Sequence, residues 1–138
     1  MENFTYTSLT ALNLDASTVA FGSVSAGGTS TVTGDSNMGT LNNATIQNTG
    51  NVQIDAKISG TDLTSVSNVS NTISVGNVQD QFSALGWNTL TTAERTESGL
   101  NLAKGSSSTT NADFRLSVPT GTVAGSYSGT TTITAFAG

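Results

Sequence analysis

Alternation between apolar and polar residues is the feature of this sequence that most restricts its fold. Residues 52–58 read Val-Gln-Ile-Asp-Ala-Lys-Ile, with apolar side chains at even positions and polar ones at odd positions. Residues 112–118 repeat the pattern and stop at Pro119, which cannot donate a hydrogen bond to a neighbouring strand. A two-residue period puts alternate side chains on opposite faces of a β-strand. We therefore expect strands with one packed face and one wet face, the latter carrying Asp55 and Lys57.

A third strong strand is expected at residues 127–137, where Tyr127 and Ile133 share a face opposite a row of Ser and Thr. Weaker strands are expected at residues 18–24, with Val19 and Phe21 facing inward, and at residues 30–33, 41–47, 72–78 and 99–103. Gly, Asn, Asp and Pro residues between these segments favour turns, and helix remains an alternative only for residues 62–67 and 89–97. This spacing predicts an all-β chain, a single-domain antiparallel β-sandwich of Ig-like or jelly-roll type. The expected core residues are Ile54, Ile58, Phe114, Leu116 and Tyr127.

The composition excludes most catalytic chemistry. The 138 residues include neither Cys nor His, whereas Ser, Thr, Gly and Asn supply more than half of the chain. His is the usual general base and a frequent metal ligand, and Cys is a common nucleophile and soft ligand. Ser–His and Cys–His pairs, zinc sites and disulfides are therefore impossible. We expect a protein that is not an enzyme, with no catalytic residues and no cofactor.

Charge and hydropathy restrict the partners. Nine acidic and four basic residues give a net charge of −5, and four scattered cations cannot form the basic stripe that binds nucleic acid. No apolar run approaches the roughly 20 residues of a membrane-spanning helix. No signal peptide is visible, so we expect either a processed or an intracellular chain. A surface built from hydroxyls and amides is common in exported proteins, which favours an extracellular or cell-surface location.

Several polar and aromatic residues are candidates for special roles. Asp35 and Asn37 resemble the start of a calcium loop, but Ile46 stands where an EF-hand needs Glu, so a self-capping turn is the main alternative to weak calcium binding. No other metal site is expected.

Glu94 and Glu97 are expected in a solvated charged turn rather than as a catalytic pair. Trp87 is expected to fill the core rather than to bind a sugar. Three Asn-x-Ser/Thr sequons begin at Asn3, Asn43 and Asn68. They are glycosylation candidates if the chain is exported by an organism that N-glycosylates. Several such sequons are expected by chance in a chain this rich in Asn, Ser and Thr.

The N-terminal residues break the alternation. Phe4 and Tyr6 share one parity, Leu9 has the other, and Leu12 and Leu14 return to the first. A strand packed along its whole length in one sheet does not switch face, because a slip of one residue inverts every side chain. We interpret residues 1–12 as an arm that can pack outside its own sheet, followed by the sandwich domain at residues 13–138. A bulge within one strand is the alternative.

Three stretches together resemble a known group of proteins. Residues 19–27 (VAFGSVSAG) resemble a strand and turn found near the start of many surface sandwich modules, and residues 46–52 (IQNTGNV) resemble the turn that follows. Residues 114–130 (FRLSVPTGTVAGSYSGT) are similar to their closing hairpin. The set resembles exported Ig-like surface proteins of archaea and uncultivated bacteria and, more distantly, camelysin/TasA-type matrix and pilus subunits. The resemblance covers about a third of the chain and implies polymerisation by donor-strand exchange. The metalloprotease activity described for camelysin is not expected, because no His is present.

The expected function is therefore a structural one. We expect the subunit of an extracellular filament or pilus, a helical polymer of identical chains joined by strand donation between neighbours. Addition of a strand requires pockets for alternate side chains, and Phe4, Tyr6 and Leu9 are the candidates to fill them. The alternative is a monomeric adhesion or carbohydrate-binding module of a larger exported protein.

Overall fold

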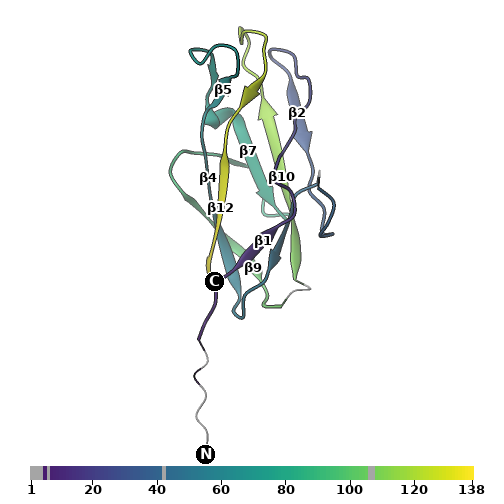
Figure 1. The fold of residues 1–138 in the computed structure, drawn as a ribbon, viewed down its shortest axis with the longest axis vertical. Helices are drawn as coiled ribbons and strands as arrows, with labels where there is room; N and C mark the ends of the chain where they lie inside the picture. The colour runs from purple at the N-terminus through teal and green to yellow at the C-terminus, as the bar shows by residue number, and fades with distance from the viewer. Residues whose placement is uncertain (1–4, 6, 42, 106–107) are drawn as a thin grey trace, which may run out of the picture.

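The computed structural model describes residues 5, 7–41, 43–105 and 108–138, and it is an antiparallel β-sandwich with its strands along the long axis (Figure 1). The described residues contain strands and one short 3-10 turn but no α-helix. The all-β prediction is confirmed.

The elements follow one another in chain order with short connections. They are β1 (Leu12–Leu14), β2 (Thr29–Val32), β3 (Thr45–Asn48), β4 (Ile54–Gly60), β5 (Leu63–Ser65), β6 (Thr72–Ile73), the 3-10 turn η1 (Val75–Asn77), β7 (Val78–Phe82), β8 (Asn88–Thr89), β9 (Arg95–Leu102), β10 (Thr109–Ser117), β11 (Tyr127–Ser128) and β12 (Thr131–Ala137).

The first sheet is built around β10. Its strand order is β1-β3-β10-β7-β8, and β2 also pairs with β10, beyond the part that β3 covers. The alternation predicted for β10 is present, since Ala112, Phe114 and Leu116 are buried and the residues between them are half-buried.

The second sheet is centred on β4. It has the order β12-β4-β9, and a small sheet of order β11-β5-β6 continues it at the upper end of the molecule in Figure 1. Tyr127 and Ile133 were expected in one strand, but Gly129 and Thr130 divide that stretch, so β11 pairs with β5 and β12 with β4.

One hydrophobic core lies between the sheets. Ile54, Ile58, Phe114 and Leu116 are buried in it, as predicted. Tyr127 is half-buried, because its hydroxyl reaches out to donate to the carbonyl oxygen of Val123 at 2.7 Å. Tyr127 was predicted to be buried, and the structure instead leaves it partly buried against the edge of the core.

Several weaker strand predictions need correction. Residues 18–24 form no strand, and residues 72–78 split into β6, the turn η1 and the first residue of β7. Strand β9 begins at Arg95, inside a stretch for which helix was an alternative, and β5 occupies the other such stretch. Pairing with β4 stabilises the β conformation of β9, which shows that tertiary contacts override weak local preference.

Asp55 was expected on the wet face and is instead buried, with 8% of its surface exposed. The pairing of β4 with β9 shifts register between Ile54 and Ala56, and this irregularity brings the backbone N–H of Asn101 to within 2.8 Å of the Asp55 Oδ1 that accepts it. A buried carboxylate is tolerated when it accepts such hydrogen bonds. Lys57 is half-buried, with its ammonium 5.5 Å from the centroid of the Phe136 ring.

Trp87 was expected in the core and is not there. It is half-buried in the turn before β8, and the guanidinium of Arg115 lies 4.3 Å from its ring centroid. Arg115 alternates with the buried Phe114 and Leu116, so it projects from the outer face of the first sheet. Trp87 therefore covers that outer face, where a cation–π contact compensates for incomplete burial.

Candidate functional site

A groove opens along one side of the sandwich, between the start of β12 and the segment that precedes β2. Its cavity volume is about 930 Å³. A cavity left by truncating one large side chain is on the order of 150 Å³, so this space corresponds to several missing side chains. In Figure 1, β7 and β10 are visible between β12 and β2.

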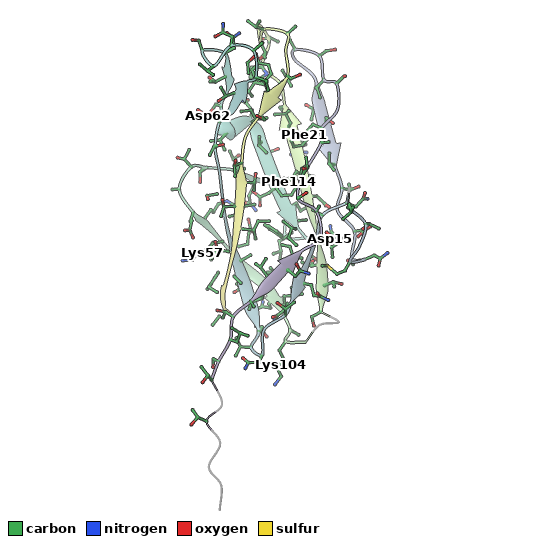
Figure 2. The ribbon with its side chains drawn as sticks, viewed as in Figure 1. Asp15, Phe21, Lys57, Asp62, Lys104 and Phe114 are labelled. Carbon is green, nitrogen blue, oxygen red and sulfur yellow. The ribbon has the colours of Figure 1, made fainter. Side chains whose placement is uncertain are left out.

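The groove reaches the hydrophobic core. Its floor includes Leu90, Phe114 and Leu116, and its walls come from residues 16–26 and residues 122–131. Figure 2 shows Phe21 beside β2, across the view from Asp62 near the top of the second sheet. None of the described residues that line the groove carries a charge. The lining is therefore suited to an apolar or hydroxyl-rich partner.

One wall of the groove is the free edge of β12. Among the described strands, β12 pairs with β4 alone. The N–H of Thr61 donates to the carbonyl oxygen of Thr130 at 2.9 Å, and the N–H of Gly138 donates to Gln53 at 3.1 Å. In an antiparallel ladder every second residue bonds to the same neighbour, so the even-numbered residues of β12 bond to β4. The backbone groups of the odd-numbered residues, Thr131, Ile133, Ala135 and Ala137, therefore point toward the open edge.

Residues 16–24, named here the edge segment, form the opposite wall. Val19 and Phe21 pack against the core, as the alternation predicted; Val24 also packs against it, and Ala20 is exposed. Within the described part of the chain, no backbone-to-backbone hydrogen bond involves the edge segment. Its one side-chain contact to the backbone is from the Ser30 hydroxyl, which donates to the carbonyl oxygen of Phe21 at 2.7 Å. The edge segment thus has the side-chain pattern of a strand without the pairing.

The N-terminal segment joins the sandwich at the end opposite the loops of β5 and β11 (Figure 1). The N–H of Leu9 donates to Oδ1 of Asn51 at 2.7 Å, and Leu9 in turn accepts from the N–H of Asn51 at 3.1 Å. Asn51 Nδ2 also donates to the carbonyl oxygen of Thr7 at 2.9 Å. A Cβ at Gly50 would collide with the Leu9 carbonyl oxygen, so glycine is needed for this close approach. Residues 7–9 of the single chain are therefore held by the turn between β3 and β4.

Of the expected donor residues, the structure describes Leu9, which is 55% exposed. Phe4 and Tyr6 lie outside the described residues, as does the sequon residue Asn3. The end of the expected arm, Leu12, begins β1 and pairs with Asn48 of β3. Strand donation by Phe4, Tyr6 and Leu9 remains a prediction.

The two described sequons differ in accessibility. The sequon at Asn43 ends in Thr45, which is fully buried and whose hydroxyl donates to Asp35 Oδ1 at 2.8 Å. The sequon at Asn68 lies in the exposed loop between β5 and β6, where Ser70 is also exposed. Asn68 is therefore the described sequon that the folded chain presents to solvent.

Asp35 and Asn37 lie in a turn that Asp35 caps. Asp35 Oδ1 accepts from the N–H of Asn37 at 2.9 Å, and Oδ2 accepts from the Thr40 hydroxyl at 2.7 Å. The hydrogen bond from Thr40, followed by those from Asn37 and Thr45, lowers the pKa of Asp35. In the described ranges no group of three or more acidic side chains is arranged to hold a metal. The contacts of Asp35 match the self-capping alternative.

A cluster of buried charges joins the two sheets away from the groove. Arg95 donates to Asp80 at 2.6 Å and to Glu97, and Asp80 is fully buried while Glu97 is 4% exposed. Burial raises the pKa of Asp80 to about 6, with a further contribution from Glu97, and the hydrogen bond from Arg95 opposes both. The expectation of a solvated charged turn holds for Glu94, which is exposed, and is wrong for Glu97.

The groove was not anticipated from the sequence. Val19 and Phe21 were assigned the correct face, but alternation cannot show whether a strand finds a partner, because pairing depends on residues far away in the chain. A usable signal was the composition of residues 16–26, which are uncharged and rich in small residues.

Comparison with known proteins gives no family for this chain. No family model matches the sequence, and no curated protein matches it. Among the described residues, no helix is long and apolar enough to cross a membrane.

Proposed function

We propose that this protein is the structural subunit of an extracellular filament or pilus, assembled by strand donation between identical neighbours. The observation that carries the proposal is the groove, which reaches the core between two backbone edges that have no strand partner among the described residues. A sandwich with such an opening is incomplete as a single chain.

The open groove is unfavourable in a free subunit. Apolar floor residues such as Phe114 and Leu116 border solvent-accessible space there, and unpaired edges of a sheet readily pair with another chain. An extended segment covers the apolar floor and bonds to the edge at the same time, which is the usual basis of strand addition.

The N-terminal residues of a second copy supply a suitable donor. Residues 3–14 contain no charge, and neither do the described residues that line the groove. Phe4 and Tyr6 share one parity, so an extended arm presents both aromatic rings to the same side, and Leu9 follows at its base. Because the donor and acceptor surfaces differ, the contact is heterologous and yields an open helical polymer unless the rotation closes a ring.

The remaining features agree with a location outside the cell. Charged residues make up 9% of the chain, and the exposed surface consists mainly of hydroxyls and amides. The sequence has neither Cys nor His, so the usual residues for thiol redox regulation and for general-base catalysis at neutral pH are missing.

The test compares the intact chain with a variant that lacks residues 2–8. Size-exclusion chromatography and electron microscopy of the intact chain should show polymers, whereas the deletion variant should run as a folded species smaller than the 13.9 kDa intact chain. Circular dichroism confirms that the variant is folded. Polymers of undiminished length from the deletion variant would show that the arm is not the donor.

A monodisperse intact chain across a wide concentration range would overturn the filament proposal. It would favour the alternative, a monomeric adhesion or carbohydrate-binding module of a larger exported protein. The groove would then be a ligand site, and binding of oligosaccharides to the monomer would be the measurement to make next.

A further inference from the structure

We infer that the acceptor has two pairing edges, so that a donated strand bonds to β12 on one side and to the edge segment, residues 16–24, on the other. The donor is the N-terminal arm of a second copy of this chain. This inference rests on the proposed strand donation and adds how the groove receives the strand. The edge segment becomes a true strand only in the assembled protein.

The position of the edge segment supports a role in pairing. It directly continues β1, which is at the border of the first sheet, and it leads into the turn before β2. The Ser30 hydroxyl of β2 donates to Phe21 and keeps the edge segment beside that strand. The edge segment thus lies where the border strand of the first sheet would lie, and β12 is the facing border strand of the second sheet.

The hydrogen-bonding requirement of an inserted strand points the same way. A β-strand directs its N–H and C=O groups alternately to both sides. If the donated strand bonded only to β12, the groups on its other side would be left unpaired at the mouth of an apolar groove. Each buried unpaired backbone group costs about 1–3 kcal/mol. Apart from the Phe21 carbonyl, which accepts from Ser30, the backbone groups of the edge segment have no hydrogen-bond partner among the described residues and are available to such a strand.

Length and side-chain pattern are also compatible. The nine residues of the edge segment span about 30 Å when extended, at roughly 3.3 Å per residue, so this edge is long enough to pair with an extended arm of residues 2–8. Val19 and Phe21 of the edge segment point inward and Ala20 outward, and Ile133 of β12 points inward and Thr132 outward. A donated strand with Phe4 and Tyr6 inward directs Thr5 outward, next to Ala20 and Thr132.

Amide hydrogen exchange tests the inference. In the variant that lacks residues 2–8, the amides of the edge segment should exchange rapidly, as expected for groups without partners. In polymers of the intact chain these amides, together with those of Thr131, Ile133 and Ala135, should exchange at least tenfold more slowly. Amides of β4, which is paired on both sides in the single chain, provide the internal control.

The outcomes separate this inference from the proposed function. Slow exchange at β12 with unchanged rapid exchange in the edge segment would mean that strand donation occurs on one edge only, and the inference would be overturned. Polymers in which neither edge is protected would instead overturn strand donation into this groove.

Cross-linking gives an independent readout, because the natural chain has no Cys and each introduced thiol is unique. A donor carrying Thr5→Cys is mixed with deletion variants carrying Ala20→Cys or Thr132→Cys, and Asn3→Cys and Thr7→Cys donors test other registers. Intermolecular disulfides are expected at both acceptor positions. The matched control is Thr96→Cys, an exposed outward position on β9 at the opposite edge of the second sheet. Cross-links at Thr96 in place of Ala20 would overturn the inference.

Discussion

Arg95 on β9 donates from Nη2 to Oδ1 of Asp80 on β7 at 2.6 Å, so an ion pair crosses the interior and joins the two sheets. The pairing is incomplete, because Asp80 Oδ2 and Arg95 Nε have no hydrogen-bond partner among the residues that the structure describes. Burial disfavours the charged form of a carboxyl group, so a carboxylate buried in this way takes up a proton at a higher pH than an exposed one.

The free energy of unfolding should therefore depend on pH through Asp80. The pKa of Asp80 is raised from 3.8 to about 6 by burial, so between these values the unfolded chain loses a proton that the folded chain keeps. Stability from this group is fully present below about pH 4 and is lost as the pH rises through about 6, by at most about 3 kcal/mol. Urea unfolding of the Asp80→Asn variant should lack this decline between pH 4 and 6.5. Glu94→Gln, which removes an exposed carboxylate, controls for net charge, and an identical slope in Asp80→Asn and the natural chain would contradict the assignment.

The core should be sensitive at Ile54 and Phe114, which are 0% and 4% exposed. Truncation of either to Ala loses transfer free energy and leaves a cavity, which should lower the free energy of unfolding by about 2–5 kcal/mol. Val66→Ala is the control, because Val66 is 74% exposed and the expected change is within about 0.5 kcal/mol. Losses below about 0.5 kcal/mol at both core positions would mean that these side chains are not packed as described.

Asn48 should be among the most important polar residues for stability. It is fully buried, and its Nδ2 donates to the carbonyl oxygens of Val52 at 2.8 Å and of Leu102 and Ala103 at 3.0 Å each. Asn48→Ala removes the donor that these three carbonyl groups share and should cost about 2–4 kcal/mol in chemical denaturation. The matched variant Asn77→Ala removes one exposed hydrogen bond to Ser74 and should cost less than about 1 kcal/mol. Equal effects of the two variants would show that burial of Asn48 carries no special weight.

No transition metal should copurify with the protein. The sequence offers oxygen ligands but no His or Cys, which disfavours tight binding of zinc or copper. Calcium should not raise Tm measurably, because both Asp35 carboxylate oxygens already accept hydrogen bonds within their own turn. Stoichiometric zinc in elemental analysis, or a clear rise in Tm with calcium that is absent in Asp35→Asn, would contradict this prediction.

The parts of the fold that could be predicted are those that depend on local pattern. Strand β10 was expected because Phe114 and Leu116 alternate with polar residues, and the burial of its residues follows that alternation. Asp55 and Glu97 were misassigned because a register shift and an ion pair, both made by residues distant in sequence, decide their burial. The edge segment shows the same limit: its inward side chains were predicted, but its lack of a pairing partner depends on the whole sandwich.

Strand β12 runs nearly along the long axis of the molecule (Figure 1). Backbone hydrogen bonds in an antiparallel pair are perpendicular to the strands, so a pull along this axis loads the bonds between β12 and β4 in shear, all at once. Bonds loaded in this way resist force together, whereas a strand peeled from one end loses them one after another. A strand lying in the groove alongside β12 would be loaded in the same direction. Tension between successive subunits would then pull its hydrogen bonds in shear, the direction in which paired β-strands resist force best.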